Sequence, residues 1–339
     1  MMQLRSFLIS VPLWLASIAW SQEVNLYSAR HYDTDQILYR NFTEKTGIKI
    51  NLVEAGGEEL LQRLIVEGRN SPADLLITVD IGRLWAAEQA SLFQPVQSEV
   101  LESRIPSRFR HPDGLWFGLS KRMRLIFVAP DRVDPAEITR YEDLADPRFR
   151  GKIVVRSSSN VYNQSLLASL IARVGLAKAE DWAAGVVANM ARPPQSNDTG
   201  QLRAVAAGQG DIAIANHYYF LRLEDSQKAE DRAVAAALTP IFPGQGEGGT
   251  GVHVNLSGVG LMKYAPNREA AIKFLEYLAS DEAQRIYAGA NYEFPVVEGL
   301  PNPDERMSAL ELIEEPVDAA MIGEHSAEAL KAFDRVGWR

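Results

Sequence analysis

The chain has 339 residues, of which 46% are hydrophobic and 23% are charged, proportions typical of a globular protein with room for two domains. Its formal net charge of −9 disfavours binding to nucleic acid or to an anionic membrane, because both depend on clustered lysine and arginine. The absence of cysteine excludes disulfides, a lipoprotein anchor and any metal site built from thiolates.

Residues 1–21 have the pattern of a secretory signal peptide. Arg5 supplies the positive amino-terminal part, residues 7–20 form an apolar stretch, and Ala19 and Ser21 are the small residues expected before a cut at Gln22. An uncleaved membrane anchor is the alternative, although the apolar stretch is short for a membrane span. Cleavage would leave 34 basic and 44 acidic residues, a net charge of −10, in a periplasmic protein.

From residue 23 onward, short apolar strands alternate with amphipathic helices. The pattern predicts a helix over 33–47, with Asp33 as its cap and Gly47 as its stop. The other expected elements are strands at 23–29, 48–55, 73–80, 152–157 and 211–216, and helices at 57–68, 82–93 and 163–175. Such alternation predicts an α/β fold in which each lobe is a mostly parallel sheet flanked by helices.

The stretch "GLWFGLSKRMRLIFVAP" separates the two series and has no turn signal before Pro130. We interpret it as an extended hinge crossing between two lobes, and expect a further strand at 254–265. Lobe 1 is assigned to residues 22–123 and 249–299, and lobe 2 to residues 124–248 and 300–339. A glycine-rich stretch at 243–251 lacks the Lys-Ser/Thr of a phosphate loop and is interpreted as a flexible connector.

Four tyrosines follow strand ends in both lobes: Tyr32, Tyr162, Tyr218 and Tyr219, with His31 beside the first. Ligands of open α/β sheets bind at the carboxyl ends of strands, so these side chains could converge in a cleft between the lobes. A single tyrosine is usually structural, but four at three strand ends indicate a site. Phenolate is a hard anionic oxygen that suits ferric iron, whereas calcium prefers carboxylates and zinc prefers histidine.

The same residues carry a family resemblance. The chain resembles the periplasmic ferric-ion-binding proteins of ABC transporters, the Fbp-type and Fut-type receptors, over nearly all of the sequence after residue 21. The matching segments are "LYSARHYDTD", "GIKINLVEAGGEEL", "SPADLLITVD", "LADPRFRGKI", "GDIAIANHYYF" and "YLASDEAQRIY". The resemblance implies the two-lobe periplasmic binding protein fold of type II.

The resemblance also implies a ligand set. In this set the ferric ion is bound by Tyr32, Tyr162, Tyr218 and Tyr219, with His31 as a further ligand. Arg203 is implied as a residue that contacts the ligands without binding the ion itself. One subclass uses a histidine, a glutamate and two tyrosines completed by an anion, but that glutamate would fall on Val79, which cannot bind metal. Glu58 and Asp80 remain reserve ligands. Direct ligation by His31, completion by an anion or water, and binding of Fe(2+) besides Fe(3+) are left open.

The resulting hypothesis is a monomeric iron receptor that serves an ABC permease and ATPase complex in the inner membrane, and that is not an enzyme. One alternative is a receptor of the same fold for a phosphonate, a polyamine or thiamine. Others are an envelope protein that carries iron incidentally and an envelope enzyme, although the sequence has no G-x-S-x-G elbow.

Overall fold

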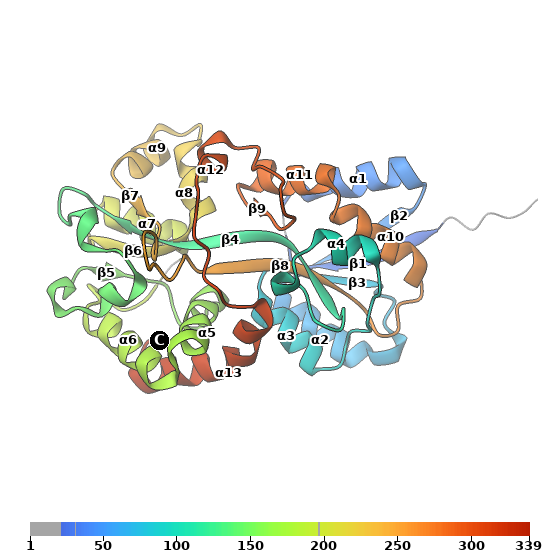
Figure 1. Cartoon of the computed structure of the whole chain (residues 1–339), viewed down its shortest axis with the longest axis horizontal. Helices are drawn as coiled ribbons and strands as arrows, with labels where there is room; N and C mark the ends of the chain where they lie inside the picture. Colours follow the sequence, from blue (N-terminus) through green and yellow to red (C-terminus); the bar gives the residue numbers. More distant parts are fainter. Residues whose placement is uncertain (1–21, 31, 196) are drawn as a thin grey trace, which may run out of the picture.

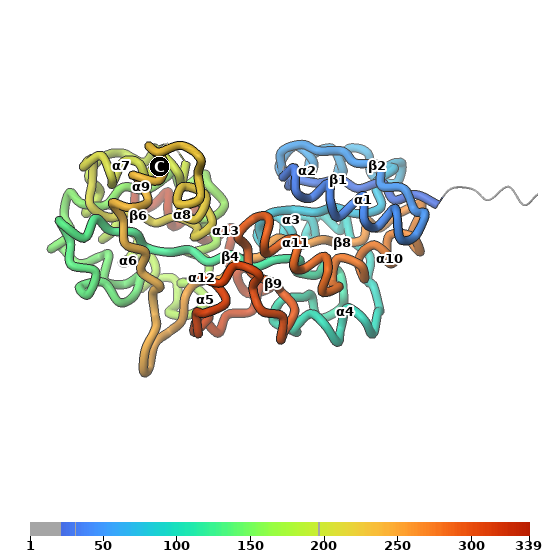
Figure 2. Tube along the Cα trace, turned by 90° about the horizontal axis from the view of Figure 1, so that it is seen from above, coloured from blue at the N-terminus to red at the C-terminus, as the bar shows by residue number. Residues whose placement is uncertain are grey.

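The computed structural model describes residues 22–30, 32–195 and 197–339. The expected signal peptide and His31 therefore lie outside the described residues. The chain forms two α/β lobes, which are joined in the middle by the long strands β4 and β8 (Figure 1). Figure 2 shows the same two lobes from above, with α11, β9 and α12 near the junction.

The first lobe is built on a sheet in the order β2-β1-β3-β8-β4. The strands β1 (Glu23–Ser28), β2 (Lys49–Glu54) and β3 (Leu75–Thr78) run parallel, and β8 (Val254–Leu261) is antiparallel to β3. Its helices are α1 (Asp35–Thr46), α2 (Gly57–Glu67), α3 (Ile81–Gln89), α4 (Glu99–Arg104), α10 (Arg268–Leu278) and α11 (Asp281–Asn291). The short strand β9 (Phe294–Pro295) pairs with β4.

The second lobe continues the sheet through β6 (Ile212–Asn216) and β5 (Ile153–Val154), with β7 (Thr239–Ile241) also on β4. Its helices are α5 (Val161–Val174), α6 (Leu176–Ala188), α7 (Asp198–Ala206), α8 (His217–Glu224) and α9 (Ala229–Ala236). After α12 (Glu305–Ser308), the chain returns to this lobe in α13 (Ala319–Val336), which packs on α5 and α6 and also contacts α3 of the first lobe. Short 3-10 turns lie at Gly68–Asn70, Ser107–Phe109, Pro135–Glu137, Tyr141–Ala145 and Pro147–Phe149.

Strand β4 (Trp116–Val128) is the expected crossing, and it belongs to both lobes. Its residues 116–123 pair with β8, and its residues 124–128 pair with β6. Both pairings are antiparallel, so the sheets are mixed rather than mostly parallel. The strand that crosses into a lobe from the other lobe is antiparallel to the strand it pairs with there: β8 to β3 in the first lobe, and β4 to β6 in the second. The two-lobe α/β architecture is confirmed, and the limits between the lobes stay a prediction.

The start of α1 differs from the expected one. The helix begins at Asp35, its N-cap is Thr34 without a side-chain hydrogen bond, and Asp33 does not cap it. Asp35 is buried and accepts from the guanidinium of Arg30 at 2.8 Å, a contact that the local pattern does not reveal. Gly47 ends the helix with φ 73°, as expected.

The glycine-rich stretch 243–251 connects β7 to β8, and its two ends contact other segments of the second lobe, while its flexibility stays a prediction. Gln245 exchanges two hydrogen bonds with the backbone of Ile313, at 2.8 and 2.9 Å. A Cβ at Gly251, where φ is +81°, would lie 2.4 Å from the backbone of Glu314 and Glu315. Only glycine fits there, because the chain passes this close to the returning segment.

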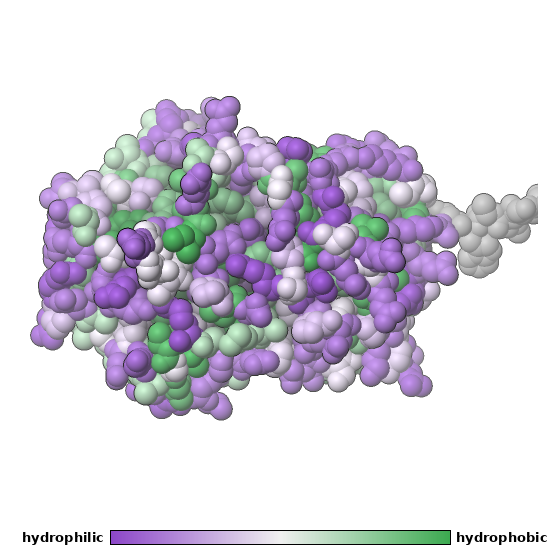
Figure 3. Space-filling view, in the orientation of Figure 1, coloured by the Kyte–Doolittle hydropathy of each residue, from purple (hydrophilic) through white to green (hydrophobic). Residues whose placement is uncertain are grey.

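The described part of the chain contains no helix with the length and apolar character needed to cross a membrane. Hydrophilic residues cover most of the face drawn in Figure 3, with hydrophobic ones scattered among them.

Candidate metal site

Tyr218 and Tyr219 lie in the first turn of α8, directly after the buried strand β6. In a strand, neighbouring side chains point to opposite faces, whereas in a helix they are separated by about 100° and can share one side. The two ring centroids are 4.4 Å apart. Tyr218 is buried and Tyr219 is half-buried. The change from strand to helix therefore lets both phenols face one point.

Tyr162 approaches them from the first turn of α5. The side chain of Asn160 caps this helix and accepts from the backbone N–H of Tyr162 at 3.0 Å. The Tyr218 hydroxyl donates to the Tyr162 hydroxyl over 3.4 Å, and the amide of Asn216 donates to the Tyr218 hydroxyl at 3.2 Å. Three phenols from two helices of the second lobe thus form one group.

Tyr32 joins this group from the first lobe, in the turn between β1 and α1. One guanidinium marks the convergence: Arg222 of α8 lies 5.0 Å from the ring centroid of Tyr32, 5.0 Å from that of Tyr218 and 5.9 Å from that of Tyr219. The structure therefore brings together four of the residues singled out from the sequence.

Burial sets the protonation of these phenols. It raises the pKa of Tyr32, Tyr218 and Tyr219 above the usual value, and the neighbouring phenols add to the shift for Tyr218 and Tyr219 because like charges repel. Without a cation between them, these three groups are neutral at pH 7. A cation that bound their oxygens would have to displace their protons.

Arginines that the sequence reasoning missed surround Tyr162. Arg122 lies 5.4 Å from its ring centroid, Arg124 5.9 Å and Arg156 5.4 Å. Arg124 and Arg156 share the buried carboxylate of Asp198, at 2.7 and 3.1 Å. A signal was present in the sequence, since "KRMR" interrupts an otherwise apolar strand and puts Arg122 and Arg124 on one face.

Asp198 also fixes the position of the two adjacent tyrosines. Its Oδ2 accepts from the backbone N–H of Asn216 at 2.9 Å, and Asn216 is the last residue before α8. Asn216 in turn bonds Tyr218. A single buried carboxylate therefore links the arginines around Tyr162 to the start of the helix that carries Tyr218 and Tyr219.

A second buried ion pair supports Tyr32. Arg30 lies 4.8 Å from the Tyr32 ring centroid and contacts Asp35 at 2.8 Å and Glu293 at 3.0 Å. Glu293 also accepts from the hydroxyl of Ser120 at 2.9 Å. Because Arg30 and Glu293 are both buried and paired, they hold the turn with Tyr32 against the crossing strand β4.

His217 packs inside the protein. Its Nδ1 accepts from the backbone N–H of Met123 at 3.1 Å, so Nε2 carries the proton and donates to the carbonyl of Tyr292 at 2.6 Å. Burial lowers the pKa of His217 to about 4. It is a neutral structural side chain in this arrangement.

The remaining candidates lie elsewhere. Arg203 is half-exposed on α7 and pairs with Asp231, so the structure gives it no contact with the tyrosines. Asp80 caps α3 and accepts from Asn255 at 2.8 Å, and Glu58 is exposed. Among the residues described, no group of three or more His, Cys, Asp or Glu is placed to hold a metal ion. In the described part of the chain, the phenols are a group of clustered oxygen atoms that could hold a metal ion.

The fold and this cluster define a class. Two α/β lobes joined by crossing strands, with polar side chains from both lobes meeting between them, are typical of a type II solute-binding protein. The family model described as "Bacterial extracellular solute-binding protein" matches residues 70–313, and the chain belongs to this family.

Individual relatives are similar over almost the whole chain. "Iron uptake protein A2" of Synechocystis sp. is 50% identical over 321 residues, which cover 95% of this chain and 91% of that protein. A Trichodesmium protein whose structure was solved in complex with iron and citrate is 52% identical, with a TM-score of 0.89. The match covers 94% of this chain and 100% of that chain. A ferric binding protein from Campylobacter jejuni is 40% identical, with a TM-score of 0.87, 93% of this chain covered and 100% of that chain.

Proposed function

We propose that this protein is an extracytoplasmic receptor that captures ferric iron between its lobes and delivers it to an ABC permease with its ATPase. The observation that carries the proposal is the meeting of Tyr32 from the first lobe with Tyr162, Tyr218 and Tyr219 from the second. The names of the relatives support it, since they are an iron uptake protein, a ferric binding protein and a protein solved with iron.

Charge balance favours a trivalent ion. Four phenolates around a ferric ion leave one negative charge, and the guanidinium of Arg222 lies over three of the rings. Within the described part of the chain, no carboxylate pairs with Arg222, so its charge remains available to the site. A ferric tetraphenolate with this counter-charge is neutral overall and can be buried at little electrostatic cost. A divalent ion would leave one more negative charge for the surrounding arginines to balance.

Ligands from both lobes also explain how binding drives closure. An open receptor offers the ion either Tyr32 or the three phenols of the second lobe, whereas a closed receptor offers all four. The ion binds the closed state more tightly and shifts the population toward it. His31 is a further proposed ligand because it precedes Tyr32 directly. The lobes that move are residues 22–123 with 249–299, and residues 124–248 with 300–339.

The decisive experiment adds ferric citrate to the purified protein and records the visible spectrum. We expect an orange-red charge-transfer band, which Tyr218→Phe and Tyr219→Phe should weaken or shift because each removes one phenolate. Tyr264→Phe is the matched control, because Tyr264 is an exposed tyrosine outside the cluster. Unchanged spectra and affinities in both cluster variants would refute the ligand assignment. A colourless complex would favour another solute.

Export is part of the proposal. Residues 1–21 act as a signal peptide that is cleaved before Gln22, and the mature receptor works as a monomer in the periplasm without catalysing a reaction. Intact-mass measurement on the protein from the periplasmic fraction tests this. A mass that retains residues 1–21 would contradict it.

A further inference from the structure

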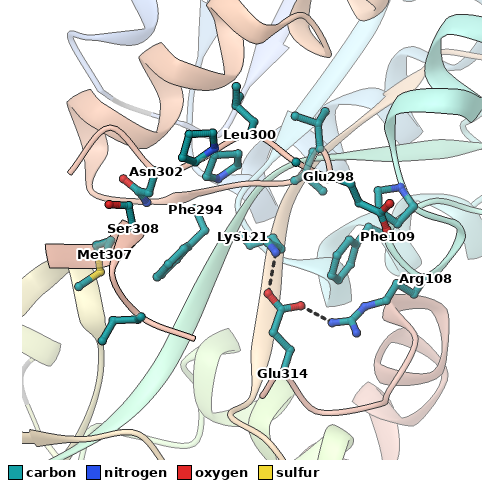
Figure 4. Close-up of a pocket in the computed structure, with 17 residues that line it drawn as sticks. Arg108, Phe109, Lys121, Phe294, Glu298, Leu300, Asn302, Met307, Ser308 and Glu314 are labelled. Carbon is teal, nitrogen blue, oxygen red and sulfur yellow. Dashed lines mark hydrogen bonds and ion pairs between the residues drawn. The ribbon is translucent and has the colours of Figure 1, made fainter. Parts of the chain in front are cut away.

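A second cavity lies outside the tyrosine cluster, at the junction of the lobes. Its volume is about 400 Å³, at the lower end of the range for small-molecule sites. One wall comes from the first lobe, with Phe109, Lys121 of β4 and Phe294 of β9. The segment between α12 and α13 contributes Leu310 and Glu314 to the lining. Figure 4 shows Glu314 facing Lys121. None of the four clustered tyrosines lines this cavity.

Two cations share one carboxylate in this cavity. Glu314 accepts from Lys121 at 2.6 Å and from Arg108 at 2.5 Å, and Figure 4 shows both side chains directed at it. Lys121 and Glu314 are largely buried. Glu298 stands at the exposed rim, where solvent screens its charge. In the inner part of the cavity, Lys121 and Arg108 therefore share one carboxylate, while the second carboxylate of the lining stays at the rim.

The same two cations have unused hydrogen-bond donors. An ammonium has three N–H groups, and Glu314 is the acceptor that the described residues provide for Lys121. The Nε of Arg108 is buried and has no partner among the described residues. Buried donors without acceptors are costly, so this corner of the cavity would gain from a further acceptor, above all an anionic one.

The rest of the lining is apolar. The rings of Phe109 and Phe294 flank Lys121, and Leu300 lies on the far side of the cavity (Figure 4). Proline side chains lie beside them and add rigid apolar surface. A ligand that satisfied the cations with one end would bury a hydrocarbon body against these walls with the other.

From this arrangement we propose that the junction cavity is a binding site for a small organic monocarboxylate with an aromatic or aliphatic body. Its carboxylate binds Lys121 and Arg108 beside Glu314, which gives two cations and two anions. Its apolar part lies between Phe109 and Phe294. The site is separate from the tyrosine cluster and does not depend on iron.

The test uses 4-fluorobenzoate as the probe and follows its fluorine NMR signal during titration with the full mature protein. We expect saturable binding of 4-fluorobenzoate, and binding at least about tenfold weaker for uncharged 4-fluorobenzamide, because hydrogen bonds to charged groups dominate. Lys121→Met should weaken benzoate binding by a similar factor. Leu310→Trp should abolish it by filling the cavity.

Lys273→Met is the matched control, since Lys273 is an exposed lysine of the first lobe away from the cavity, and it should bind the probe as the unaltered protein does. The iron charge-transfer band, recorded on each variant, reports that the fold is intact. The proposal is overturned if the amide binds as well as the acid, or if Lys121→Met and Leu310→Trp keep full affinity. It is also overturned if the unaltered protein shows no saturation up to about 10 mM.

Discussion

Iron capture by the phenol cluster should be coupled to the release of protons. Burial raises the pKa of Tyr32, Tyr218 and Tyr219, so these groups are protonated in the free protein near neutral pH and must lose their protons to bind as phenolates. At least three protons should leave per ferric ion. Each released proton makes the free energy of ferric binding depend on pH by about 1.4 kcal/mol per pH unit. Three protons correspond to about 4 kcal/mol, or a thousandfold change in affinity, per pH unit.

The sign follows from the competition between protons and metal. Affinity should rise as pH rises from about 5 to 8 and fall steeply as the solution is acidified. The assay titrates ferric nitrilotriacetate into weakly buffered protein and measures the base needed to hold the pH, corrected for protons taken up by the released chelator. Tyr219→Phe should release one proton fewer than the unaltered protein, and Tyr264→Phe should release the same number.

A proton count near zero would refute this reasoning. It would mean that the phenols do not bind as anions, whatever the spectrum of the complex. A count that is unchanged in Tyr219→Phe would remove Tyr219 from the ligand set while leaving the other phenols in place.

Three further predictions concern the groups around the tyrosines. Arg222→Met should weaken ferric binding about tenfold, because it removes the cation that lies over three rings. Arg285→Met, which replaces an exposed arginine, should leave ferric binding unchanged. Equal affinities of the two variants in a chelator competition would contradict this prediction. Asp198→Asn should lower the free energy of unfolding by about 3–5 kcal/mol in urea, because it leaves the buried guanidinium of Arg124 without its carboxylate, with amide oxygens as its remaining side-chain acceptors. The exposed Asp181→Asn should cost little, and a loss below about 1 kcal/mol for Asp198→Asn would exclude a strong ion pair. The pKa of His217 is lowered to about 4, so below about pH 6.5 the unfolded chain takes up a proton at this residue while the folded chain does not. Roughly 3 kcal/mol of stability should therefore be lost between pH 6.5 and 4. In urea unfolding measured across this pH range, His217→Gln should make the stability depend less on pH.

Local patterns in the sequence were informative wherever one segment decides the structure. A short apolar run located β6, and the turn from strand to helix placed Tyr218 and Tyr219 next to each other on α8. The long apolar stretch without a turn predicted β4 as a crossing strand. These features depend on neighbours within a few residues, which the sequence displays directly.

Contacts between distant segments could not be read in this way. Arg30 contacts Glu293 across 263 positions. The helix α1 begins at Asp35, which pairs with Arg30, and not after a cap at Asp33. Arg203 looked like a supporting residue by resemblance, yet its helix turns it toward Asp231, and Arg222 occupies the position over the rings.

The sequence by itself thus determined the two series of strands and helices, the crossing between them and the phenols at the ends of strands. Only the tertiary structure decided which charges surround those phenols, which arginine lies over them, and where the chain leaves a charged cavity at the junction. The physical reason is that hydrophobic periodicity is a local property, whereas burial and ion pairing depend on which segments the fold brings together.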